Sequence, residues 1–151
     1  MQLALPDDFR VSLQIHNGMR NSYCDVHRFF NYEALLSTHT IPLVWQSMQR
    51  LFGGEDRLAG CPITRTRKIK NAAWWNPAWV PITDADGDGF VMDLDPGPTG
   101  IAGQMFYFYH DGARPRRVAA NSYITWLGGI ARKLRSNKFS VRDGSIWLDS
   151  P

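Results

Sequence analysis

The sequence has little cysteine and no long apolar run. Its 151 residues include two cysteines, Cys24 and Cys61, without the CxxC spacing of redox or zinc motifs. Two separate thiols favour a reducing compartment, so we expect a cytoplasmic protein. The longest stretch without Asp, Glu, Lys or Arg has 16 residues, 34–49, and carries polar side chains. A membrane-spanning helix needs about 20 apolar residues, and the N-terminus lacks a signal-peptide pattern, so we expect no membrane association.

Motifs of common catalytic sites are also missing. The sequence contains neither GxSxG nor HExxH, and the glycine-rich residues 97–103 lack the Lys-Ser/Thr of a phosphate loop. The four histidines have no ligand spacing: His16, His27, His39 and His110. A nucleophilic Cys24 or Cys61 paired with a histidine stays open, although a buried structural thiol is the better interpretation. We therefore expect no enzymatic activity, no metal and no cofactor.

One segment does match a metal motif, the run Asp84-Ala-Asp86-Gly-Asp88-Gly89 with Asp95 at the twelfth position. This is the pattern of a calcium loop, in which several carboxylates surround a hard cation. Such a site needs a helix on each side, whereas Pro77 precedes the run and residues 96–98, Pro-Gly-Pro, follow it. We interpret the run as a hairpin turn and keep a metal-binding loop at 84–95 as an alternative.

Charge is distributed in blocks rather than evenly, although the formal net charge is only +3. Residues 84–95 hold five Asp and no Lys or Arg. Residues 57–70 hold five basic side chains, and residues 114–142 hold eight, with no acid in either block. Such a bipolar surface favours solvated faces or a protein partner over a nucleic-acid groove. We expect a protein partner and no nucleic acid.

Hydrophobic periodicity predicts a single α+β domain over residues 1–151. Helices are expected to begin near Pro6, at Thr40 and after Ser122, which would cap the last one. Short strands are expected at 29–36, 79–82, 90–94, 105–109, 118–120, 139–141 and 146–148. This order indicates a mostly antiparallel, mixed sheet with helices packed mainly on one face.

Tryptophan is abundant, with six residues in the chain. We expect Trp79 in the core and either Trp74 or Trp75 at the surface, where it could anchor a partner. The acids Asp84, Asp86 and Asp88 at the tip of the turn are the second part of this predicted partner-binding surface. If the partner does not bind there, the basic side at 114–117 is the alternative.

An ordered set of short motifs resembles the SUKH superfamily, over roughly residues 5–135. The matching positions are Pro6, Asn17, Gly18, Trp79, Pro81, Asp93, Asp95, Pro96, Gly103, Gln104, Ser122 and Trp126. The resemblance implies an α+β domain without catalytic residues, in which these positions are structural. Members usually carry a helix before the signature that begins at Leu5-Pro6, whereas this chain begins almost at that signature. Residues 136–151 extend past the common core.

The resemblance also implies function. Bacterial members are similar to immunity proteins that bind and block toxins, and fungal members resemble hubs of cell-wall signalling. The leading hypothesis is therefore an immunity protein that neutralises a cognate toxin, such as a nuclease, whose basic groove would attract an acidic tip. The alternatives are a regulatory scaffold in cell-wall assembly or stress signalling and a metal-binding protein.

Overall fold

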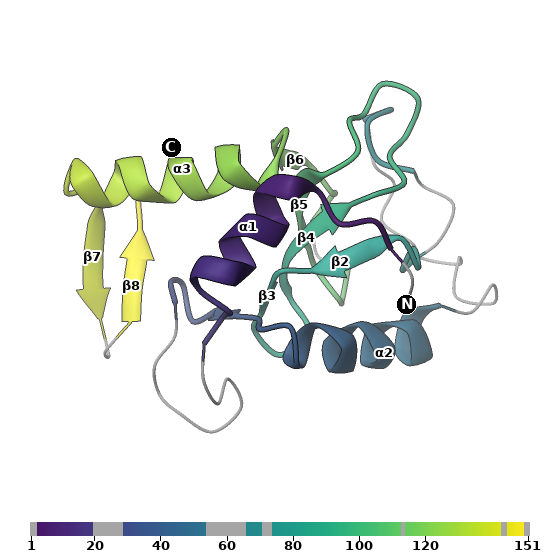
Figure 1. The fold of residues 1–151 in the computed structure, drawn as a ribbon, viewed down its shortest axis with the longest axis horizontal. Helices are drawn as coiled ribbons and strands as arrows, with labels where there is room; N and C mark the ends of the chain where they lie inside the picture. The colour runs from purple at the N-terminus through teal and green to yellow at the C-terminus, as the bar shows by residue number, and fades with distance from the viewer. Residues whose placement is uncertain are drawn as a thin grey trace.

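Short antiparallel strands and three helices make up the described part of the chain, a single α+β domain as predicted (Figure 1). The computed structural model describes residues 3–19, 29–53, 66–70, 74–112, 114–142 and 145–149. Cys24, His27 and Cys61 lie outside them. The elements are α1 (Asp7–Ile15), β1 (Ala34–Leu35), α2 (Thr40–Phe52), β2 (Trp79–Pro81), β3 (Thr83–Asp84), β4 (Gly89–Asp93), β5 (Gln104–Phe108), β6 (Val118–Ala120), α3 (Tyr123–Arg135), β7 (Phe139–Arg142) and β8 (Ser145–Leu148).

The central sheet has the strand order β2-β4-β5-β6, and every neighbouring pair is antiparallel. Val91 of β4 pairs with Phe106 of β5, and Phe90 pairs with Tyr107. Directly paired residues point to the same face, so Val91 and Phe106 line one face, and Phe90 and Tyr107 line the other. Two smaller antiparallel pairs, β1–β3 and β7–β8, flank this sheet.

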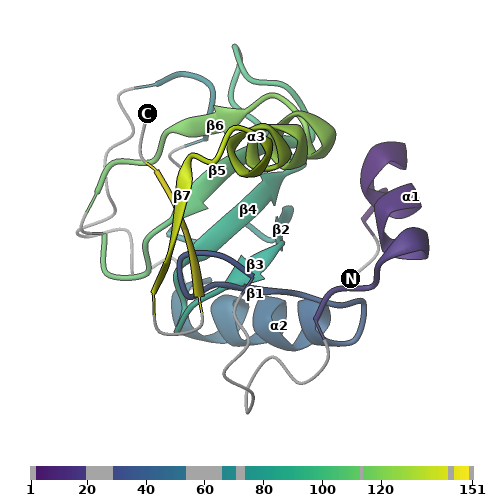
Figure 2. The same cartoon turned by 90° about the vertical axis from the view of Figure 1, so that its left-hand side faces the viewer.

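Helices cover both faces of the central sheet (Figure 2). Val44 and Met48 of α2 border one small void together with Val91 and Phe108, which places α2 on the Val91 face. On the other face, the ring of Trp126 in α3 lies 5.2 Å from the ring of Phe90. α1 packs beside α3. The expectation that the helices pack mainly on one face of the sheet therefore holds for α1 and α3. α2 covers the opposite face, because its apolar stripe contacts Val91 and Phe108.

Side-chain hydrogen bonds lie at or near the start of each helix. The Ser122 hydroxyl accepts the Thr125 amide at 3.2 Å, as predicted for α3. Asp8 links two helices, because Oδ1 accepts the Phe9 amide of α1 and Oδ2 accepts the Ile124 amide of α3, at 2.8 and 3.0 Å. Thr40 is not a simple cap: its Oγ1 accepts the Ser37 amide at 2.7 Å, and Ser37 Oγ accepts the Thr40 amide at 3.2 Å. The turn that starts α2 is thus set at Ser37.

Two of the family-like motifs attach the N-terminal helix to the rest of the domain. Asn17 Oδ1 accepts the Thr38 amide at 2.8 Å, and Gly18 has a φ of +64° against the backbone of Leu36. A Cβ at Gly18 would lie only 2.5 Å from Leu36 carbonyl atoms, so glycine is required there. Pro6 packs on Gly103, whose missing side chain leaves room for the proline ring. These contacts hold α1 against the backbone before α2 and against the turn before β5.

The predicted strand at 29–36 is largely wrong. Only β1 forms within it, because Asn31 and Tyr32 take left-handed φ values of 48° and 63° and make a tight turn. This turn binds the C-terminal hairpin: the Asn31 amide donates to the Ile146 carbonyl at 2.7 Å, and the Leu148 amide donates to Asn31 Oδ1 at 3.1 Å. The hairpin itself, β7–β8, is confirmed, and Figure 1 shows it beneath the C-terminal half of α3.

A buried arginine completes the core between β6 and the aromatic residues. Arg116 is only 2% exposed. Its guanidinium lies 4.7 Å from the centre of the Trp79 ring and 5.6 Å from that of Phe108, and it donates to the Trp74 carbonyl. Sequence reasoning placed this residue in a basic surface block, whereas the planar guanidinium is buried because it can stack on aromatic faces.

We expect Arg116→Ala to lower the free energy of unfolding by about 3 kcal/mol, because it removes stacked atoms and leaves a cavity beside Trp79. Arg117→Ala is the control, since Arg117 is exposed, and it should change stability by less than about 0.5 kcal/mol. Urea denaturation followed by tryptophan fluorescence measures both. Equal stability of the two variants would show that Arg116 does not support the core.

Candidate interaction surface

Asp93 of the Asp-x-Asp-Pro motif is the centre of a buried hydrogen-bond network. Asp93 Oδ1 accepts the Trp79 indole at 3.1 Å and the Asp95 amide at 3.0 Å, and Oδ2 accepts the Gln104 side chain at 2.9 Å. Burial raises the pKa of Asp93, and these hydrogen bonds oppose the rise. Because its partners come from β2 and β5, this carboxyl joins three adjacent strands.

Asp95 continues this network at the end of the sheet. Lys70 and Asn76 donate to the Asp95 carboxylate, and these hydrogen bonds lower its pKa. The Gln104 side chain also donates to the Lys68 carbonyl at 2.8 Å. The basic segment 66–70 is therefore docked on the sheet by the Lys68 carbonyl and the Lys70 ammonium group, although the side chains of Lys68 and Lys70 are exposed.

The two candidate tryptophans differ in exposure. Trp75 is 1% exposed and makes edge contacts with the rings of Trp79 and Phe108, at 5.7 and 5.3 Å. It cannot act as a surface anchor, because it fills the core beneath α2. Trp74 is half-buried and stacks on Phe52 at 6.1 Å. Trp79 is fully buried, as predicted.

The acidic run forms a hairpin turn between β3 and β4, as predicted. Asp86 and Gly87 have φ values of 54° and 98°, and Asp84 Oδ1 accepts the Gly87 amide at 3.2 Å. Asp88 Oδ1 accepts the His110 amide at 2.8 Å and lies 2.7 Å from His110 Nδ1. Asp86 is exposed. Among the described residues, no three His, Cys, Asp or Glu side chains are grouped to hold a metal ion.

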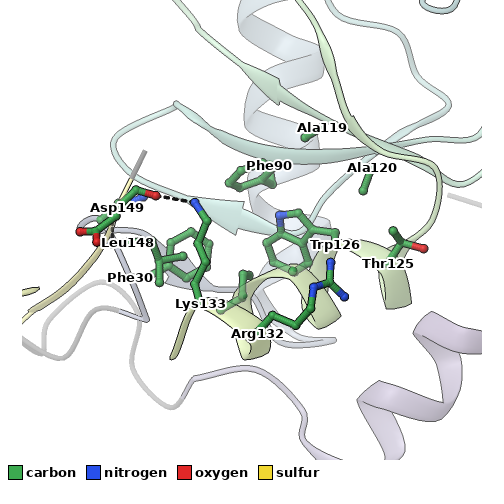
Figure 3. A pocket seen from close by; sticks show the side chains of 13 residues that line it. Phe30, Phe90, Ala119, Ala120, Thr125, Trp126, Arg132, Lys133, Leu148 and Asp149 are labelled. Carbon is green, nitrogen blue, oxygen red and sulfur yellow. Dashed lines mark hydrogen bonds between the residues drawn. The ribbon is translucent and has the colours of Figure 1, made fainter. Parts of the chain in front are cut away.

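An open groove lies between α3, the sheet and β8 (Figure 3). We call it the apolar groove; it has a volume of about 360 Å³, and its apolar lining is Phe30, Phe90, Ala119, Ala120, Trp126, Ile130 and Leu148. Figure 3 shows Lys133 reaching from α3 to the Asp149 carbonyl at one end, to which it donates. Polar side chains thus border an apolar floor.

A larger hollow adjoins this groove and shares Asn31, Phe90, Ala119 and Leu148 with it. Its volume is about 770 Å³. The other side chains that line it are acidic or aromatic apart from Arg114: Glu33, Asp88, Asp111, Tyr107, Tyr109 and Trp147. We call it the aromatic–acidic hollow. Of the acids predicted to bind a partner, Asp88 lines it, whereas Asp84 and Asp86 do not.

Glu33 lies at the base of this hollow with 1% of its surface exposed. The Thr83 hydroxyl donates to its carboxyl group. Burial raises the pKa of Glu33 to about 8, and the nearby carboxylates of Asp88 and Asp84 add to the rise. Glu33 therefore keeps its proton at neutral pH. Sequence reasoning missed this residue; the available signal was a single acid within an apolar, aromatic segment.

Comparison with known proteins identifies the family of this chain. Residues 1–129 match the model of the SMI1 / KNR4 family (SUKH-1). The chain belongs to the SMI1/KNR4 family. It is 36% identical over 180 aligned positions to the "Glucan synthesis regulatory protein" of Neurospora crassa. It is 28% identical over 162 positions to the "Cell wall biosynthesis/cell cycle regulator smi1" of Schizosaccharomyces pombe.

This SMI1/KNR4 chain spans about a third of the length of these curated relatives, because the alignments cover 98% of the chain but 34% and 32% of the two proteins. The family match ends within α3, so β8, one wall of both cavities, lies outside it. Within the described residues, the three helices are too short or too polar to cross a bilayer.

The Glu33 environment predicts how stability depends on pH. The folded state holds a proton up to pH about 8, whereas the unfolded chain releases it near pH 4.5, so stability falls as pH rises between these values. Glu33→Gln removes this loss. We expect the variant to gain about 1.4 kcal/mol relative to wild type for each pH unit between about 5 and 8. Urea denaturation at pH 5, 6, 7 and 8 measures this gain. A pH-independent difference would show that Glu33 ionises normally.

Proposed function

We propose that the chain is a non-catalytic protein-binding module with a regulatory role in cell-wall or glucan synthesis. The observation that carries this proposal is the family match together with two relatives that are both named as regulators. These names favour the regulatory alternative over the toxin-immunity interpretation. The separate cysteines of the sequence support a cytoplasmic location for this module.

The geometry supports a binding role at the apolar groove. Its floor consists of side chains from α3, β4, β6 and the turn before β1, and its rim carries Arg132, Lys133 and Asp149. An apolar centre with a polar rim is the usual anatomy of a protein interface. Ala119 of β6 is exposed and borders both the groove and the adjoining hollow, so a bulky side chain there would obstruct both.

The immunity interpretation predicts a different partner and a different surface, the acidic turn at Asp84, Asp86 and Asp88. An immunity protein would capture a toxin effector, whereas a regulator would capture components of wall synthesis or its signalling. Identification of the captured protein therefore distinguishes the two roles. The exposed Asp86 at the acidic turn is the feature that a basic toxin would contact.

The test is quantitative co-purification from the native cells with tagged wild type, Ala119→Arg and Ala102→Arg. Both alanines are exposed, but Ala102 lies in the turn before β5, away from the groove. We expect Ala119→Arg to reduce recovery of the partner by about tenfold or more, because an arginine would occupy the groove. Ala102→Arg should recover as much partner as wild type.

Equal recovery with Ala119→Arg and wild type would place the partner on another face. Failure of wild type to enrich any protein under cross-linking would contradict the binding role itself. Circular dichroism and thermal melting of each variant check that the substitution leaves the fold intact.

A further inference from the structure

The aromatic–acidic hollow combines two kinds of side chain that attract cations. Tyr107, Tyr109 and Trp147 supply aromatic rings, and Glu33, Asp88 and Asp111 supply carboxyl groups. The rings of Tyr107 and Tyr109 lie 4.7 Å apart, so they form one continuous wall. Aromatic faces attract cations through their quadrupole, and carboxylates add charge and hydrogen-bond acceptors. The arrangement is therefore complementary to a positively charged side chain rather than to an apolar one.

The chain itself shows that this wall accepts a guanidinium. Arg114 also lines the hollow, and its guanidinium carbon lies 5.7 Å from the centre of the Tyr109 ring. Arg114 is exposed, so this contact is at the rim and can exchange with a competing ligand. A second guanidinium that displaced Arg114 would stack on the same Tyr109 ring, and it would lie closer than Arg114 to Asp88 and Glu33.

The charges around Glu33 would favour such a ligand. Asp84 and Asp88 face it from the β3–β4 turn, Tyr107 faces it from β5, and both carboxylates disfavour its ionised form. Tyr109, Asp111 and Arg114 complete the charged and titratable lining of the hollow, and His110 lies against Asp88. The base of the hollow therefore holds a buried carboxyl group that would ionise when a cation arrives.

We propose that the aromatic–acidic hollow binds an arginine side chain of the partner protein, with Tyr107 and Tyr109 stacking on the guanidinium and Asp88 and Glu33 accepting its hydrogen bonds. This inference rests on the proposed function, because it assumes that a protein partner docks at this surface. Arginine is favoured over lysine because its planar group both stacks and donates in a fork. Binding ionises Glu33 and releases its proton, so affinity rises with pH until the pKa of Glu33 is reached.

The test uses the full chain labelled with 5-fluorotryptophan and small probes, and it needs no identified partner. The probe is N-acetylarginine amide, and N-acetylcitrulline amide is its neutral isostere. Fluorine NMR follows the Trp147 resonance, which is assigned with Trp147→Phe. We expect saturable shifts with arginine and an affinity at least about tenfold weaker for citrulline, because only the cation pairs with the carboxylates. From pH 6 to pH 8 the arginine affinity should rise about tenfold or more.

Three variants locate the site. Glu33→Gln should weaken arginine binding about tenfold at pH 8 and abolish its pH dependence, since the amide cannot ionise. Arg114→Gln should strengthen binding severalfold, because the intramolecular competitor at Tyr109 is removed. Asp86→Asn is the matched control: this acid is exposed on the same turn but does not line the hollow, so affinity should stay the same. Asp88→Asn replaces Glu33→Gln if the latter does not fold, with a similar loss expected.

Equal binding of arginine and citrulline, or unchanged arginine affinity in both Glu33→Gln and Arg114→Gln, would overturn the arginine site. This result is separate from the binding role of the module. Co-purification of a partner that is recovered equally by wild type and Glu33→Gln would leave the module function standing while excluding the hollow as the arginine site. If Glu33→Gln recovers less partner and the arginine probe binds as expected, both the binding role of the module and the arginine site are supported.

Discussion

The buried carboxyl group of Asp93 is the constraint on which the sheet depends. A carboxyl removed from water is costly unless donors surround it, and here they come from Trp79 of β2, Gln104 of β5 and the Asp95 amide. These donors reach both oxygens only in the observed register, in which Trp79 and Gln104 both pair with Asp93. The same Gln104 also holds the backbone of Lys68. Asp93 thus holds β2, β4 and β5 in register and, through Gln104, also holds the segment 66–70.

A sheet fixed in this way presents two different faces. The Val91 face is sealed, because α2 covers it, the ring of Trp75 meets those of Trp79 and Phe108 edge to face, and Arg116 stacks on Trp79 and Phe108. The Phe90 face is only partly covered: Trp126 reaches Phe90, whereas Tyr107 and Tyr109 stay half-buried. The C-terminal hairpin, held by Asn31, adds a wall without closing this side. The groove and the hollow follow from this incomplete coverage.

Local signals predicted much of this fold. The Ser122 cap, the β7–β8 hairpin and the turn at Asp86-Gly87 are confirmed because each depends on residues that lie close together in the sequence. The sequence left open whether Trp74 or Trp75 is buried, and it gave no sign that Arg116 is buried, because both outcomes depend on rings from distant strands. The cavities could not be predicted, since their walls join segments as distant as Asn31, Tyr107 and Leu148. In the segment 29–36, Asn31 is the residue that favours a turn, but the surrounding aromatic side chains favour a strand.

The two buried acids, Asp93 and Glu33, differ in what their burial does for the stability of the fold. Asp93 accepts three hydrogen bonds that hold strands together, so these bonds offset the cost of burying its carboxyl group. Glu33 is equally buried, yet its side chain faces other carboxylates rather than cations, and its burial lowers stability above pH about 4.5. An apolar side chain of similar size would relieve this cost. Residues that oppose stability in this way tend to gather at functional sites, and the position of Glu33 beneath an open, aromatic-lined hollow agrees with that pattern.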